Sequence, residues 1–250
     1  MHQILFKMIL SVALLLADSI PGLQNYRLPD GGPVYAETGM NDGFLVEPWN
    51  ALTSLLMLIP VIYWLFRIRK ERSTYKFMLF AIPLMALGGI GSALFHGLRI
   101  SVVFLIMDVA PSAILTLSLA IYFWIKLLKK WYYVLLLFIP MVLLRFLVFT
   151  SLPGHAAINT SYAVTGATIL LPIPFLLHRT HYRGVWPISL TLLSFGLALM
   201  FRESDMRASE VLDMGSHFLW HTFSAIGGFF ILQYLYVFRQ TEQLAVGSWQ

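Results

Sequence analysis

Three histidines, one aspartate and one serine lie in segments that are otherwise apolar enough for a lipid bilayer: Ser92, His96, Asp108, His217 and His221. An ionisable side chain in hydrocarbon costs on the order of a few kcal/mol, so each such residue is a candidate for function. His217 and His221 are four residues apart and share one face of a helix, as do Ser92 and His96. Two imidazoles on one face can bind a metal, and a third from another helix completes a zinc site with a position left open for water.

A metal centre of this kind needs a separate proton acceptor. The zincin pattern His-Glu-x-x-His is absent, because Phe218 stands at the position of its glutamate. Asp108 is the candidate for that role. The chain has no cysteine, so disulfides and thiolate ligands are excluded, and imidazole or oxygen ligands must hold any metal.

The composition is that of a membrane protein. Hydrophobic residues make up 58% of the 250 residues, charged residues only 12%, and the mean hydropathy is +0.76. A soluble domain carries about twice this charged fraction. The net charge of +5 does not indicate a nucleic-acid partner, because the basic residues fall in short loops where they set orientation. No protein partner is predicted; the expected partner is a membrane lipid.

Apolar runs long enough to cross a bilayer core of roughly 30 Å occur seven times after residue 50. They predict an all-α protein with a seven-transmembrane-helix bundle. The expected spans are Ala51–Phe66, Lys76–Phe95, Val102–Ile125, Trp131–Phe149, Thr160–Leu177, Val185–Phe201 and Gly215–Phe238. Prolines within these runs are read as kinks, because membrane helices tolerate them.

The distribution of Lys and Arg sets the expected orientation. Basic residues concentrate in alternate loops, after spans one, three and five, and Arg239 follows span seven. By the positive-inside rule, these loops and the C-terminus are cytoplasmic. Residues 1–20 read as a signal peptide, with an uncleaved extra helix as the alternative. The expected organisation is then an extracytoplasmic segment 21–50, a catalytic domain 51–238 and a cytoplasmic tail 239–250, in a bacterial inner membrane.

This topology brings the polar residues to one depth. Span two runs outward and spans three and seven run inward, so the five residues of the predicted site fall in the outer third of the bilayer at 1.5 Å per residue. Glu47 and Asn50, at the mouth of span one, and Arg202, at the end of span six, share this level. We therefore expect one site, open toward the extracytoplasmic side.

The pattern resembles a known family. Ser-x-x-x-His on span two, Asp on span three and His-x-x-x-His on span seven are similar to the CREST superfamily of membrane hydrolases, which includes alkaline ceramidases, adiponectin-receptor-like proteins and GPI-remodelling lipases. Glu47-Pro-Trp-Asn50 followed by Ser54 resembles the Glu-x-x-Asn-x-x-Ser pattern of the ceramidases. The resemblance extends from about Glu37 to Phe238.

The resemblance implies roles for the shared residues. Zinc would be held by His96, His217 and His221, Asp108 would orient or deprotonate the attacking water, and Ser92 would help to stabilise the oxyanion. Eukaryotic members also bind calcium through the outer segment, and this chain offers oxygen donors there that calcium accepts. These donors are Glu37, Asn41, Asp42 and Glu47. The Asp-Trp-x-Glu start of the eukaryotic motif is missing, which leaves calcium open.

The leading hypothesis is a zinc-dependent intramembrane amidase that cleaves ceramide-like lipids to a sphingoid base and a fatty acid. The same site could act on a phospholipid or another acyl lipid. From a different class, an adiponectin-receptor-like protein could use a structural zinc to join three helices, and a fourth protein ligand would then be expected. A haem or quinone protein with bis-histidine ligation is a more distant alternative. An ion transporter would place polar residues at mid-depth or at both faces, which this chain does not.

Overall fold

Helices are the only regular secondary structure in the part of the protein that its computed structural model describes, which is residues 30–40, 43–152, 160, 164 and 166–247. No β-strand occurs in these residues. The elements are α2 (Pro48–Ser54), the 3-10 helix η1 (Leu55–Met57), α3 (Leu58–Ile68), α4 (Lys76–Leu98), α5 (Val102–Leu128), α6 (Tyr132–Ser151), α8 (Pro172–Arg179), α9 (Val185–Ala208) and α10 (His217–Gly247). The prediction of an all-α chain is confirmed.

Six helical stretches among the described residues are long and apolar enough to cross a membrane, with α2, η1 and α3 together forming the first. This finding indicates a multi-pass membrane protein. The remaining predicted span, Thr160–Leu177, falls partly on residues outside the described part; within it, α8 begins at Pro172 after a turn at Leu171. The predicted signal segment, residues 1–20, lies entirely outside the described residues.

Several helices run past the ends expected from hydropathy. α9 continues to Ala208 rather than Phe201, and α10 continues to Gly247 rather than Phe238. Hydropathy marks only the part of a helix that lies in hydrocarbon, whereas backbone hydrogen bonding continues wherever polar residues remain helix-compatible. The extra turns of α9 are important for the site, because they carry Arg202 and Asp205.

Most of the long helices that contain a proline continue past it. Pro83, Pro111 and Pro140 lie inside α4, α5 and α6, which continue through them. At Pro60 the first span changes to the 3-10 turn η1 just before the proline and then resumes as α3. A proline has no N–H and its ring crowds the preceding turn, which explains the local change. The prediction that these prolines do not end the spans is confirmed, whereas α8 begins at Pro172, after a turn at Leu171.

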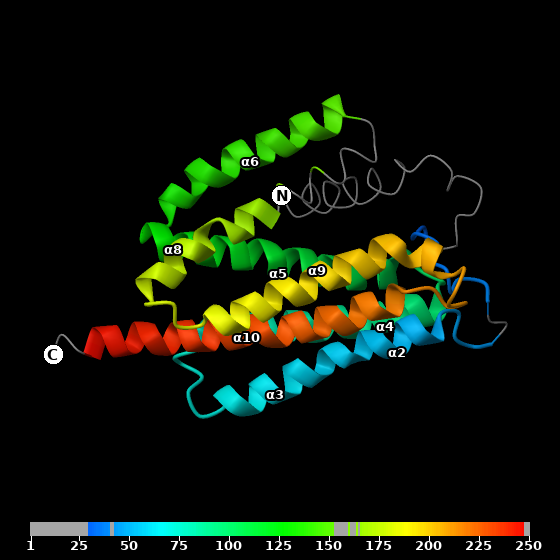
Figure 1. The fold of residues 1–250 in the computed structure, drawn as a ribbon, viewed down its shortest axis with the longest axis horizontal. Helices are drawn as coiled ribbons and strands as arrows, with labels where there is room; N and C mark the ends of the chain where they lie inside the picture. The colour runs from blue at the N-terminus through cyan, green and yellow to red at the C-terminus, as the bar shows by residue number, and fades with distance from the viewer. Residues whose placement is uncertain (1–29, 41–42, 153–159, 161–163, 165, 248–250) are drawn as a thin grey trace. The chain divides into compact units, whose positions relative to one another are not determined.

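The chain forms two compact units, of which one, Tyr35–Leu117 with Leu177–Gln250, contains every described residue of the predicted site. In this unit α10 lies beside α9 and also packs on α2, η1 and α3, while α4 packs on α2, η1 and α3 (Figure 1). α10 is therefore the central helix of the unit. In the other unit, the Trp124 indole donates a hydrogen bond to the carbonyl of Thr168 at 2.7 Å.

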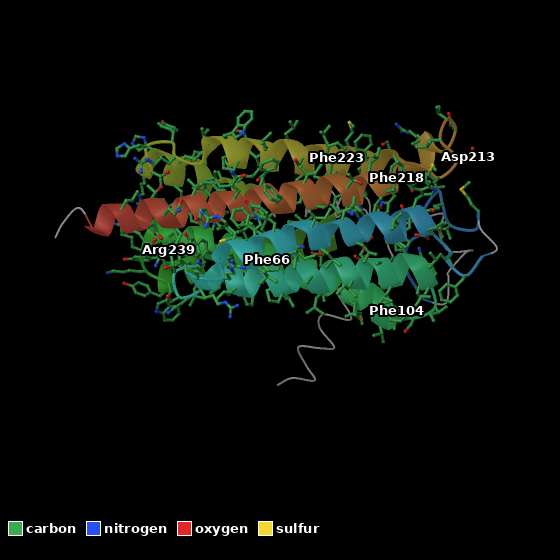
Figure 2. The ribbon with its side chains drawn as sticks, turned by 90° about the horizontal axis from the view of Figure 1, so that it is seen from below. Phe66, Phe104, Asp213, Phe218, Phe223 and Arg239 are labelled. Atoms are coloured by element: carbon green, nitrogen blue, oxygen red, sulfur yellow. The ribbon has the colours of Figure 1, made fainter. Side chains whose placement is uncertain are left out.

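Aromatic packing joins the same helices at the end of the site-bearing unit that is remote from the histidines. The Trp64 indole donates to the carbonyl of Phe229 at 3.2 Å, and the rings of Tyr75 and Tyr236 stack at 4.8 Å. Figure 2 shows Arg239 at this end of α10 and Asp213 and Phe218 near the opposite end. These contacts set the register of α10 against α3 and α4, and hence the level at which its histidines meet α4.

Candidate metal centre

The three histidines come from two helices that meet near one end of the unit. His217 and His221 occupy the first two turns of α10, and His96 lies in the last turn of α4. The ring centroids of His96 lie 5.2 Å from His217 and 4.8 Å from His221, and those of His217 and His221 are 4.8 Å apart. One nitrogen from each ring lies within 4.8 Å of the other two, so the three could bind one metal ion.

Each of the three rings has one buried nitrogen without a hydrogen-bond partner among the described residues: His96 Nε2, His217 Nδ1 and His221 Nε2. The side chains are almost completely shielded, with exposures of 0%, 2% and 8%. A buried polar atom without a partner costs about 1–3 kcal/mol. Three such atoms in one cluster are explained if the three neutral imidazoles bind the same cation through their lone pairs. Zinc fits this set of donors. The geometry does not by itself identify the metal.

Glu47 holds the His96 ring in the orientation that this arrangement requires. Its Oε2 accepts a hydrogen bond from His96 Nδ1 at 2.5 Å, which leaves Nε2 for the cluster. A carboxylate behind a ligating histidine fixes the tautomer and makes the free nitrogen a better donor to metal. The other oxygen, Oε1, accepts from Arg99 Nη1 at 2.6 Å and Thr38 Oγ1 at 2.5 Å. Burial would raise the pKa of Glu47, but the hydrogen bond from His96, together with the charge of Arg99, holds it below its usual value.

The end of α4 brings Arg99 and Glu47 together. Arg99 adopts a left-handed conformation at φ 51°, which ends the helix, and its guanidinium lies 4.4 Å from the centre of the Phe95 ring. The amides of Val46 and Glu47 donate to the carbonyls of Gly97 and His96 at 2.9 and 3.1 Å. These carbonyls have no partner within the helix, so the outer segment completes the end of α4 while placing Glu47 beside His96.

Glu37 has a structural task at the start of the first span. Its carboxylate accepts hydrogen bonds from the amides of Trp49 and Asn50 at 2.7 and 3.0 Å. These amides belong to the first turn of α2, where an anion is favoured by the helix dipole. Burial raises the pKa of Glu37 above its usual value, and the two backbone hydrogen bonds oppose that effect. Both Glu37 and Glu47 thus bond to protein donors. Asn41 and Asp42 lie outside the described residues, and the calcium site stays a prediction.

Close helix packing places Asp108 beside Ser92. A Cβ on Gly91 would collide with the backbone carbonyl of Met107. α4 and α5 therefore approach each other more closely here than any residue larger than glycine at position 91 would allow. The Asp108 carboxylate accepts a hydrogen bond from the Ser92 hydroxyl and lies near His96. Asp108, Ser92 and the histidines therefore form one group, as the depth argument predicts.

The remaining predicted residues, Asn50, Ser54 and Arg202, lie around this group. Ser54 Oγ is 3.0 Å from Ser92 Oγ and 2.7 Å from the carbonyl of Asn50. The side-chain nitrogen Nδ2 of Asn50 donates a hydrogen bond to Glu47 Oε2 at 3.3 Å. The side-chain oxygen Oδ1 of Asn50 is buried and has no partner in the described part of the chain. The Arg202 guanidinium lies 5.4 Å from the centre of the Trp220 ring.

Two residues that contribute to the centre do not stand out in the sequence. The ring of Tyr35 stacks on His217 with centroids 4.0 Å apart, and it lies 5.0 Å from His96. Burial raises the pKa of the Tyr35 phenol above its usual value, and the nearby Asp108 carboxylate raises it further. Asp205, on α9, accepts hydrogen bonds from the amides of Ser216 and His217 at 2.8 and 2.9 Å. Neither residue lies in an apolar run or at helical spacing from a ligand, so only the fold could identify it.

Comparison of the sequence with models of known protein families and with curated proteins gives no significant match.

Proposed function

We propose that this chain is a zinc-dependent membrane hydrolase that cleaves the amide bond of ceramide-like lipids, in keeping with the resemblance to the alkaline ceramidases of the CREST superfamily. The observation that carries the proposal is a cluster of three buried histidines that could bind one metal ion, each with a buried ring nitrogen that has no hydrogen-bond partner in the described part of the chain. Three protein ligands with a further position left for water are typical of catalytic rather than structural zinc. No other cluster of three or more metal-ligating side chains is found within the described residues.

The groups around the histidines match the needs of amide hydrolysis. A bound zinc ion supplies Lewis acidity, which makes water nucleophilic near neutral pH and polarises an acyl carbonyl. Asp108 takes the proton from the attacking water, as a general base close to the reacting atoms. Protonated in that step, it can return the proton to the leaving amine.

Ser92 acts on the developing negative charge. Ser54 Oγ carries one proton and lies within hydrogen-bonding distance of both the Asn50 carbonyl and Ser92 Oγ. In the resting site the Ser92 hydroxyl donates to the Asp108 carboxylate. Once Asp108 has taken the proton of the water, this acceptor is lost, and Ser92, which accepts from Ser54, can turn its own proton to the substrate oxygen. A hydroxyl aimed at the position where charge develops lowers the barrier selectively, because the ground-state carbonyl carries less charge.

We also propose how the chain crosses the membrane. The seventh span is formed by residues 160–177, and the loops rich in Lys and Arg are cytoplasmic together with the C-terminus. The metal centre then lies near the extracytoplasmic side of a bacterial inner membrane. The segment that carries Tyr35, Glu37 and Glu47 covers the site from that side, and the lipid enters with its amide at the level of His96.

The experiment measures metal content and hydrolysis together on the full chain purified in detergent. We expect about one zinc per chain and release of fatty acid from ceramide. His217→Ala should lose both metal and hydrolysis, because it removes one of three ligands. Asp108→Asn should keep the metal and lose hydrolysis. The matched control is His178→Ala, which removes an exposed histidine at the end of α8 and should match the wild type in both measurements.

The outcomes separate the alternatives. Release of fatty acid from a phospholipid but not from ceramide would change the substrate class and keep the site. Zinc without hydrolysis of any acyl lipid would favour a structural metal. Turnover by a metal-free His217→Ala protein, or a wild-type protein that binds no metal, would refute the proposal.

A further inference from the structure

Asp205 connects three segments that are far apart in the sequence. It lies near the C-terminal end of α9 and is only 4% exposed. Its Oδ1 accepts hydrogen bonds from the amides of Ser216 and His217, and its Oδ2 accepts one from the amide of Ala36 at 2.9 Å. One buried carboxylate thus joins α9, the first turn of α10 and the outer segment next to Tyr35.

The turn before α10 is built around this carboxylate. Gly215 has a φ of +69°, a conformation that favours glycine. A Cβ at Gly215 would collide with Asp205 Oδ1 and with the Ala36 side chain, so only glycine lets the three segments meet. Ser216 Oγ donates to the carbonyl of Phe201 at 2.6 Å, which ties the same turn to α9 a second time. The start of α10 is therefore held at a fixed place on α9.

The outer segment brings an aromatic ring against the metal-facing histidine. Asp205 holds the amide of Ala36, and the neighbouring Tyr35 ring stacks on the His217 imidazole at 4.0 Å with 30° between the planes. The Tyr35 amide donates to Thr38 Oγ1 at 2.9 Å, and Thr38 Oγ1 donates to Glu47. Asp205 therefore acts on His217 from two sides, through its backbone and through the ring that covers its imidazole.

We propose that Asp205 is a positioning residue of the metal centre: it anchors both the backbone of His217 and the Tyr35 ring, so that His217 Nδ1 faces the other two histidines. A simple helix cap would need only the α10 amides. The third hydrogen bond, to Ala36, has no capping role and is explained by the position of Tyr35. The inference rests on the metal-binding part of the proposed function and is independent of the substrate.

The test compares Asp205→Asn with Asp213→Asn in the full chain. Asparagine keeps the size of the side chain but replaces one of the two acceptor oxygens by a donor, so one of the two anchors is lost. Asp213 lies in the connection between α9 and α10, is exposed, and undergoes the same change of charge, which makes it the matched control (Figure 2). The readouts are the release of zinc to a chelator and the visible absorption spectrum of the cobalt-loaded protein, which reports ligand geometry.

We expect Asp205→Asn to fold, with unchanged helical circular dichroism, but to hold metal about 10–100-fold more weakly, as is typical when the support of a ligating histidine is removed. Its cobalt spectrum should change, whereas that of Asp213→Asn should match the wild type. Wild-type metal release and an unchanged spectrum in Asp205→Asn would overturn the inference while leaving the proposed function intact. A wild-type protein without metal would overturn both.

A second variant decides the case if Asp205→Asn does not fold. Tyr35→Ala removes the ring that lies on His217 and leaves every hydrogen bond at the start of α10 in place. It should also weaken metal binding and alter the cobalt spectrum. Unchanged values in Tyr35→Ala would refute the part of the inference that assigns the ring a role.

Discussion

Replacing Glu47 by Gln removes the charge of a side chain that accepts four hydrogen bonds, without changing the shape of that side chain. Glu47 is completely buried and accepts hydrogen bonds from His96, Arg99, Thr38 and Asn50. Arg99, its buried counter-ion, is only 3% exposed. Glutamine keeps one acceptor oxygen and introduces an amide donor beside groups that already donate. The variant therefore leaves Arg99 without its Glu47 charge partner and loosens the hold on His96.

Two magnitudes follow from this geometry. Removing one partner of a buried ion pair costs up to about 3–5 kcal/mol of folding free energy, and the other contacts of Arg99 keep the expected cost of Glu47→Gln below that limit. Loss of the carboxylate behind a ligating histidine weakens metal binding about 10–100-fold, which corresponds to about 1.4–2.8 kcal/mol. The two effects share the same contacts, so they are not expected to add.

The assay is reversible unfolding in mixed detergent micelles, with zinc release to a chelator measured in parallel. The matched control is Glu242→Gln, which removes a partner of Arg239 at 2.9 Å in a pair whose side chains are 27% and 38% exposed. A partly exposed pair that reaches solvent on both sides contributes about 0–1 kcal/mol, so the control should stay within that range. If Glu47→Gln were no less stable than Glu242→Gln and released zinc at the wild-type rate, the role assigned to Glu47 would be refuted.

Two further predictions concern helix packing and metal removal. Gly91→Ala should force α4 away from the carbonyl of Met107 and cost about 1–3 kcal/mol of folding free energy. The variant should keep its zinc but hydrolyse more slowly, because Asp108 moves relative to Ser92. The control is Gly196→Ala, at a position in α9 where a Cβ meets nothing within 4 Å, and this variant should not lower the stability of the protein. Equal stability of the two variants would contradict the packing argument. Chelation should lower the free energy of unfolding by about 2.7 kcal/mol relative to protein at a free zinc concentration 100 times the dissociation constant, and an unchanged unfolding midpoint would show that the folded state gains nothing from the metal.

The sequence alone was sufficient for the features that depend on local chemistry. Hydropathy predicts six of the helices that the structure contains, because each apolar run is long enough to span a bilayer by itself. The spacing of His217 and His221 places them on one helix face, and this relation is internal to α10. The high cost of ionisable groups in hydrocarbon also singles out His96 and Asp108 before any contact is known.

The tertiary structure alone decided which groups support these residues. Glu47 is 49 residues from its partner His96, and Asp205 is 169 residues from Ala36. No periodicity records such pairs, since each depends on how two chain segments approach in space. Gly91 and Gly215 show the physical reason: each permits an approach that a single Cβ would prevent. The sequence identified the groups that could bind a metal, and the packing of the helices decided which of their nitrogens meet and which carboxylates hold them there.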